Sequence, residues 1–268
     1  MAPEIIAPVA TMCLLFFSYR STPGYRLVVA ANRDEFLGRP TAPLAFLNEE
    51  KTILAGRDLQ GGGTWLGITA QLKFAAITNY RDPQANKPEA PSRGEILMDY
   101  LTGAKDAGQY LLGLAGKSER YNGFNLVLGD REGLYYYSNR STGIRRLGPG
   151  FYGLSNNLLD VPWPKVARGK DLLHPHMVAT DHIDAAQLLD LLEDDFCPPD
   201  DQLPDTKVGL DWERLLGSIF INGVDYGTRS SAVITVADTG RIAFFEKTIL
   251  RSPGTGVSAK IHHLSMQS

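Results

Sequence analysis

The stretch YRLVVAANRDEFLGRP, residues 25–40, places an apolar run directly before four polar residues. Residues 27–31 are typical of a buried strand, and Asn32, Arg33, Asp34 and Glu35 follow them without a break. Rigid elements commonly present catalytic and binding side chains at their ends. The end of this strand is therefore the first candidate site in the chain.

A second apolar run, residues 13–19, lies just upstream, and the segment RSTPG (20–24) joins the two runs. Pro23 and Gly24 supply turn chemistry, so the two runs predict an antiparallel hairpin. Residues equidistant from the centre of the turn face each other, which places Cys13 opposite Asn32 with Arg33 and Asp34 immediately beyond. The predicted hairpin brings a thiol, an amide, a guanidinium and a carboxylate to one edge.

The remaining patterns predict an α+β fold, with antiparallel hairpins at both ends of the chain and helices layered on sheets. A capping box formed by Ser92 and Glu95 predicts one helix, and helical spacing predicts two more after Asp181 and Asp211. Further strands are expected at residues 64–69, 73–79, 124–130, 133–139, 231–238 and 241–247.

Composition narrows the class of protein. The chain has 268 residues, 43% of them hydrophobic, and a net charge of -3. We expect residues 1–11 to be a leader or extension and residues 12–268 to form a single domain. The interspersed charge argues against nucleic-acid binding. Only Cys13 and Cys197 are cysteines, which excludes a disulfide framework and favours a reducing compartment.

The N-terminal segment has neither the basic start nor the apolar length of a signal peptide. No run reaches the ~18 apolar residues that a membrane span needs. The sequence therefore predicts a soluble, cytoplasmic protein without stable membrane insertion.

Cys13 supports two interpretations. If the chain began at Cys13, the α-amino group of that residue would be the base that activates its own thiol. Asp34 would orient the ammonium group, and Arg33 would favour the thiolate or bind an anionic substrate. The alternative is a buried structural cysteine beside an Arg33–Asp34 surface ion pair.

Three asparagines are candidates for binding an oxyanion. Asn79 ends the predicted strand 73–79, and Asn156 and Asn157 follow an apolar segment. Amide groups at strand ends are suitable oxyanion donors, but asparagine is equally common in turns.

Arg229 precedes the strand 231–238, where it would clamp a carboxylate or phosphate or simply begin the strand. The glycines at 61–63 lack a phosphate-loop lysine, so they predict a turn or a wall close to substrate. Pro175 separates His174 from His176, which makes a metal pair on a helix implausible. We expect no metal and no cofactor.

Taken together, these motifs resemble the NRDE family, also called the transport and Golgi organization protein 2 family. The resemblance extends from about Met12 to Thr248 and covers the motifs MC, ANRDEF, GGTWLGI, TNYRDP, SRGEIL, YNGFNLVLGD, GLSNNLLDVPWPK and YGTRSSAVI. It implies a fold related to the N-terminal nucleophile hydrolases, which is a four-layer αββα sandwich.

The resemblance also implies roles for several residues. Cys13 is similar to the nucleophile of that hydrolase class and Asp34 to its aspartate, with Arg33 beside them. Asn156 or Asn157 resembles its later oxyanion residue. Two further counterparts are Asn79, for the middle asparagine, and Arg229.

Family members typically begin at Met-Cys, whereas eleven residues precede Met12 here. Three alternatives follow: the leader is a wrongly assigned start, or it is removed, or Cys13 never has a free α-amino group. In the third case the nucleophile mechanism fails.

Two functions follow from the resemblance. The first is a Cys-dependent amide or acyl hydrolase or acyltransferase, with Asn32, Trp65 and Arg229 contacting a small amide or acyl substrate. The alternative is a non-enzymatic carrier of a lipid, acyl-CoA or haem, linked to secretion and Golgi organization. In a carrier, the polar strand end would bind a head group, and Phe16, Phe17 and Trp65 would line the cavity. An interaction protein in secretion is a third option, but no exposed amphipathic stretch favours it.

Overall fold

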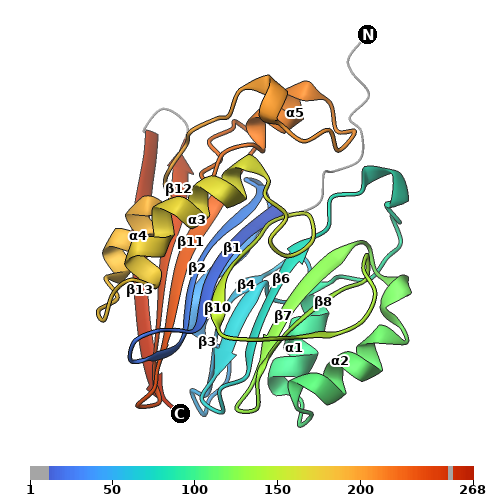
Figure 1. Cartoon of the computed structure of the whole chain (residues 1–268). Helices are drawn as coiled ribbons and strands as arrows, with labels where there is room; N and C mark the ends of the chain where they lie inside the picture. Colours follow the sequence, from blue (N-terminus) through green and yellow to red (C-terminus); the bar gives the residue numbers. More distant parts are fainter. Residues whose placement is uncertain (1–11, 253–255) are drawn as a thin grey trace.

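The computed structural model describes residues 12–252 and 256–268 as two antiparallel β-sheets with helices (Figure 1). The first sheet has the strand order β10 (Gly150–Leu154), β1 (Met12–Thr22), β2 (Tyr25–Phe36), β11 (Tyr226–Ala237), β12 (Arg241–Ser252) and β13 (Gly256–Gln267). The second has the order β3 (Thr41–Phe46), β4 (Ile53–Asp58), β5 (Leu66–Thr69), β6 (Phe74–Asn79), β7 (Phe124–Gly129), β8 (Leu134–Ser138) and β9 (Arg145–Leu147). The predicted α+β class is confirmed.

The described residues hold five α-helices, and four of them cover the outer faces of the sheets (Figure 1). They are α1 (Gly94–Thr102), α2 (Ala107–Ala115), α3 (Pro164–Met177), α4 (Ala185–Leu191) and α5 (Leu210–Leu215). Three short 3₁₀ helices span Pro83–Ala85, Ser118–Arg120 and Asp200–Gln202. Helices α3 and α4 lie on the first sheet and α1 and α2 on the second, while α5 lies at the top of the view. None of these helices is long and apolar enough to cross a membrane.

Strand β1 shows how the two cores are divided. Successive side chains of a strand point to opposite faces. Leu15 and Phe17 accordingly pack in the core between the sheets, whereas Leu14 and Phe16 pack against the helices on the outer face. The continuous apolar sequence of residues 14–17 reflects burial on both sides.

The β1–β2 hairpin differs from the predicted register by one residue. Cys13 pairs with Arg33, and Asn32 pairs with Leu14, so the predicted Cys13–Asn32 pair is wrong. The register shifts between Tyr19 and Thr22, where one extra residue enters β1 as a bulge. The side chains of directly paired residues share a face of the sheet. Cys13 and Arg33 therefore face the second sheet, and Asn32 lies on the helix-covered face.

Helix α1 begins differently from the prediction. The Ser92–Glu95 capping box is wrong: Ser92 Oγ accepts a hydrogen bond from the Gly94 N–H, and Glu95 Oε1 accepts one from the Tyr121 hydroxyl. The pattern was valid as a helix signal, but a partner 26 residues further along the chain holds the glutamate.

Helices α4 and α5 also begin at residues other than those predicted. Asp184, not Asp181, caps α4, because its carboxylate accepts two backbone N–H groups of the first turn. Helix α5 begins after Gly209 and includes Asp211, which was expected to precede it.

Candidate functional site

Cys13 lies at the start of β1 and is 7% exposed. Its side chain borders a small, narrow cavity between the two sheets. The lining is mostly apolar and includes Leu15, Ala31, Trp65 and Ile77. The thiol is therefore placed against a narrow apolar space and not in open solvent.

Arg33 pairs with Cys13 and borders the same cavity. Its guanidinium lies over the Trp65 ring, 4.3 Å from the centroid, and Nη1 donates to Thr41 Oγ1 at 3.1 Å. Nη2 lies 3.7 Å from Glu35 Oε2, and neither Nε nor Nη2 has a hydrogen-bond partner within the described residues. The Arg33 side chain is thus 2% exposed and still has N–H groups without a hydrogen-bond acceptor, in the residue that pairs with Cys13.

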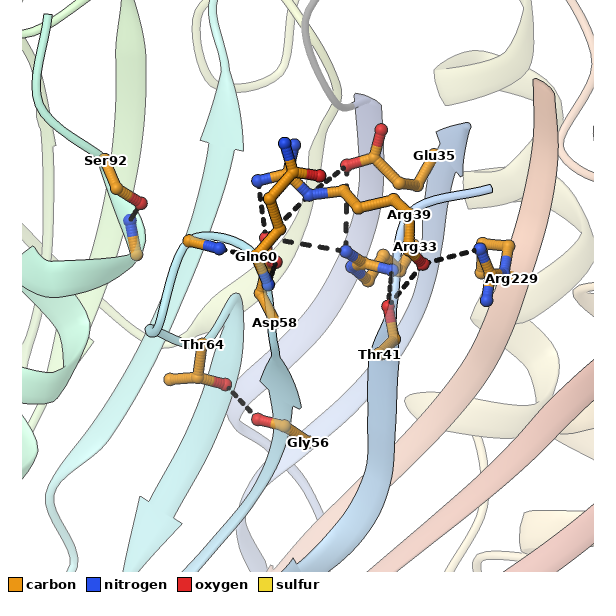
Figure 2. Close-up of polar contacts among 12 residues, drawn as sticks. Arg33, Glu35, Arg39, Thr41, Gly56, Asp58, Gln60, Thr64, Ser92 and Arg229 are labelled. Carbon is orange, nitrogen blue, oxygen red and sulfur yellow. Dashed lines mark hydrogen bonds and ion pairs between the residues drawn. The ribbon is translucent and has the colours of Figure 1, made fainter. Parts of the chain in front are cut away.

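An ion-pair network holds Arg33 in this position (Figure 2). Arg39 binds Asp58 through Nη2, at 2.8 Å, and approaches Glu35 Oε2 at 3.4 Å. Asp58 Oδ1 accepts the N–H groups of Gln60 and Gly61, which fixes the glycine-rich turn. The expectation of a turn at the glycines is confirmed.

Asp34 pairs with Met12 and lies on the opposite face of the sheet from Arg33. It is fully buried; Oδ1 accepts a hydrogen bond from Thr228 Oγ1 at 2.7 Å, and Oδ2 has no such partner within the described residues. Burial raises the pKa of Asp34 to about 6, although Lys165 and Arg251 favour the charged form.

Arg81 and Glu213 form a buried ion pair that joins the loop after β6 to helix α5. Arg81 Nη1 lies 2.7 Å from Glu213 Oε2, and Glu213 Oε1 accepts hydrogen bonds from the backbone and hydroxyl of Thr206. Burial lowers the pKa of Arg81 to about 10 in spite of its partner. This pair fixes α5 beside the loop that follows β6.

The predicted asparagines hold backbone carbonyls and turns. Asn32 Nδ2 donates to the carbonyls of Leu192 and Ile219, both at 2.9 Å, on the helix-covered face. Asn156 Nδ2 donates to the Asn79 carbonyl at 2.9 Å.

Asn157 Oδ1 accepts the N–H of Leu158. The structure thus brings Asn79 and Asn156 together at the end of β6, whereas the Asn32 amide points to the face of the first sheet opposite the thiol. Their roles toward an oxyanion stay predictions.

Arg229 lies inside β11, at a bulge between Thr228 and Ser230, and not before the strand as predicted. Its Nη1 donates to the carbonyls of Phe36 and Leu37. It also donates to the Arg39 carbonyl, the bond that Figure 2 shows. These bonds shape the loop after β2 and thereby place Arg39 in the network around Arg33.

Two of the three aromatic residues expected in the cavity lie elsewhere. Trp65 lines the cavity, whereas Phe16 packs under the helices and Phe17 packs between the sheets against Tyr152. Residues 12–252 and 256–268 contain no group of three or more His, Cys, Asp or Glu side chains arranged to hold a metal ion.

A family model described as Transport and Golgi organisation 2 matches residues 12–251. The chain belongs to this family. It is 38% identical over 283 residues to the Transport and Golgi organization protein 2 homolog of Bos taurus, covering 96% of this chain and all of the relative. The corresponding homologs of Mus musculus and Homo sapiens are each 34% identical with the same coverage.

The match to the Transport and Golgi organisation 2 family begins at Met12 and therefore includes Cys13 and the whole strand-end cluster. The resemblance inferred from the motifs is confirmed as family membership.

Sequence reasoning missed two cations near the thiol of this family member. Lys165, in the first turn of α3, is 3% exposed, and its Nζ has no hydrogen-bond partner in the described part of the chain. Burial lowers the pKa of Lys165 to about 8, against the favourable charge of Asp34. Arg93, whose Nη1 donates to the Gly123 carbonyl, is half-buried, and desolvation lowers its pKa to about 10.

A signal for Lys165 was present in the sequence. Pro164 begins α3, so the lysine stands at the positive end of a helix dipole, where cations are disfavoured. A lysine in that position needs a compensating reason, which here is the buried carboxylate of Asp34.

We expect the Cys13 thiol of the 268-residue chain to be nearly inert toward iodoacetamide at pH 8. Burial, and next the charge of Asp34, raise the pKa of Cys13 from 9.0 to about 12, although Arg33 opposes them. Three pH units reduce the thiolate fraction, and hence alkylation, about 1,000-fold. Peptide mapping after timed alkylation measures this, with exposed Cys197 as the internal control. Equal rates at the two cysteines would contradict the placement of Cys13.

Proposed function

We propose that this protein is a Cys-dependent amide or acyl hydrolase or acyltransferase of the N-terminal nucleophile type. In this proposal its layered sheets and helices are the four-layer αββα sandwich of that class, and its active form begins at Cys13. The observation that carries the proposal is the position of the Cys13 thiol, between an apolar cavity and the Arg33 guanidinium, whose Nε and Nη2 have no hydrogen-bond partner in the described structure.

The burial of the thiol explains why a local base is needed. A thiol whose pKa is about 12 holds its proton at neutral pH, and only the thiolate is the nucleophile. An α-amino group on Cys13 would lie one residue from the Met12–Asp34 pair and within reach of its own sulfur.

In the proposed reaction, the Cys13 thiol proton passes to the α-amino nitrogen while Sγ forms a bond to the substrate carbonyl carbon. The bond from that carbon to the leaving nitrogen, oxygen or sulfur then breaks, and the leaving group takes the proton from the α-ammonium. Water, or an acceptor amine or alcohol, next cleaves the thioester and returns the thiol. The apolar cavity wall suits the acyl group.

The charged and amide groups have separate roles in this proposal. Arg33 offers its donors to the carbonyl oxygen or to an anionic part of the substrate. Asn156 fixes the end of β6 through the Asn79 carbonyl, so this strand end is the proposed oxyanion wall. Asp34 orients the amine.

The experiment uses a chain cleaved by a protease so that Cys13 is its first residue, with Cys197→Ala to remove the other thiol. Intact-mass spectrometry after exposure to p-nitrophenyl butyrate is expected to show one butyryl group, which hydroxylamine removes because it is a thioester. The matched controls, Cys13→Ala and the uncleaved chain, are expected to show no such group. Absence of the adduct on a verified Cys13-initiated chain refutes the proposal.

A non-enzymatic carrier of a lipid, acyl-CoA or haem is the second candidate, because the apolar lining at Cys13 and the Arg33 donors offer such a ligand an apolar wall and a cationic group. The relatives are named for transport and Golgi organization, which fits a carrier as well as an enzyme. Native mass spectrometry for a co-purified ligand and a haem Soret titration test it. A carrier retains its ligand in the Cys13→Ala variant. The free thiols of Cys13 and Cys197 fit the cytoplasm, which we propose as its location.

A further inference from the structure

Two buried side chains of opposite charge lie near Cys13, and each has a terminal polar atom without a hydrogen-bond partner in the described structure. These atoms are Asp34 Oδ2 and Lys165 Nζ, and no ion pair within 4 Å joins the two residues in the described structure. Native proteins normally satisfy buried polar atoms. A third polar group is therefore expected to complete this arrangement.

The backbone of Cys13 lies where such a group would be needed. Asp34 pairs with Met12, the residue directly before Cys13. Helix α3 packs on β1 and carries Lys165 in its first turn, and the charges of Lys165, Asp34 and Cys13 act on one another. In a chain that begins at Cys13, the α-nitrogen enters this group.

The charge balance around Asp34 limits how many of its neighbours can be protonated. One buried carboxylate would face two amines, and two ammonium groups beside one carboxylate are unfavourable away from water. Two other carboxylates lie near these groups, but both already have cationic partners: Glu213 pairs with Arg81, and Glu35 pairs with Arg33 and Arg39. Arg251 from β12 and Arg33 from β2 bring further positive charge toward Asp34. One of the two amines must therefore be neutral near pH 7, and their titrations are coupled.

We propose that Lys165 shares a single positive charge with the Cys13 α-amino group against Asp34, and so keeps that amine in the form that accepts the thiol proton. This inference rests on the proposed function, since it requires a chain that begins at Cys13. Lys165 forms no bond to substrate in this scheme; the proton moves from Sγ to the α-nitrogen, and Lys165 sets the pH at which the nitrogen can receive it.

The first test is the pH profile of Cys13 acylation by p-nitrophenyl butyrate in the Cys13-initiated chain with Cys197→Ala. Lys165→Met removes the competing cation, so Asp34 alone stabilises the ammonium. The acylation rate rises with pH as the α-amine loses its proton, and this rise is the acid limb of the profile. In Lys165→Met the acid limb is expected to shift to higher pH by at least about one unit, so the rate at a pH below the limb falls about tenfold. The plateau at high pH should change little. Lys165→Arg retains the cation and should keep the limb at or below its original position. A purely structural lysine would lower the rate at every pH without moving the limb.

The second test needs no turnover. In Cys13→Ala, also cleaved before residue 13, competitive acetylation with acetic anhydride measured by mass spectrometry gives the pKa of the α-amine. Lys165→Met is expected to raise that pKa by the same amount, and Lys165→Gln serves as the neutral variant if the methionine variant does not fold.

The two proposals fail separately. If Lys165→Met leaves both the acid limb and the pKa of the α-amine unchanged while Cys13 is still acylated, the role of Lys165 is refuted and the proposed function is not. Absence of acylation in the parent chain refutes the proposed function, and the amine titration still decides whether Lys165 shares its charge.

Discussion

Replacing Glu213 with Ala is expected to lower the free energy of unfolding by about 3–5 kcal/mol. The carboxylate is the 2.7 Å partner of Arg81, and both side chains are about 95% removed from solvent. Its loss leaves the Arg81 guanidinium buried without this counter-charge, and Thr206 loses both of its hydrogen bonds to Glu213. Urea unfolding followed by circular dichroism at pH 7 measures the change.

A second arginine–carboxylate pair near α5 provides the control. Arg214 binds Asp200 at 2.7 Å, but the two side chains are 47% and 52% exposed. Solvent screens such a pair, so Asp200→Ala is expected to lower the free energy of unfolding far less than Glu213→Ala does. Equal losses in the two variants would show that Glu213 does not act through burial.

Side-chain periodicity was sufficient to predict the long strands around the site. Strands β1, β2, β6 and β11 are buried on both faces, so each contains a nearly continuous apolar run that identifies it in the sequence. The strands that the sequence did not predict are β3, β4, β9, β10 and β13. The reason is clear for β3 and β9. Pro43 interrupts β3, and the β9 segment 145–147 is three residues long with two exposed arginines, so neither shows a usable period.

The candidate site was predicted only in part, because its geometry depends on distant segments. The cluster of polar residues after residue 31 was visible in the sequence. The bulge between Tyr19 and Thr22 was not, and it decides that Arg33 rather than Asn32 pairs with Cys13. Lys165 reaches the site from a helix more than 130 residues away from Asp34, a contact that no local pattern encodes.

Phe16→Ala is expected to destabilise the protein by about 3–5 kcal/mol, because the ring is fully buried between β1 and α3. Adding volume on the helix side of this contact is also expected to destabilise the protein. A Cβ added at Gly169 of α3 would lie 2.1 Å from Phe16 Cζ, so Gly169→Ala overpacks the interface and should cost about 1–3 kcal/mol. Chemical denaturation of each variant measures both values.

The double variant Phe16→Ala, Gly169→Ala tests whether these two costs have one origin. With the ring absent, the new methyl group enters the vacated space, so Gly169→Ala should become neutral or stabilising, apart from the gain in helix propensity that alanine brings in either background. The expected coupling is at least about 1 kcal/mol. Phe17→Ala is the matched control: Phe17 is equally buried but stacks on Tyr152 between the sheets, 5.1 Å between ring centroids. It should cost a similar amount and leave the effect of Gly169→Ala unchanged. Coupling of Gly169 to Phe17 as strong as to Phe16 would contradict the assignment of alternate β1 residues to separate cores.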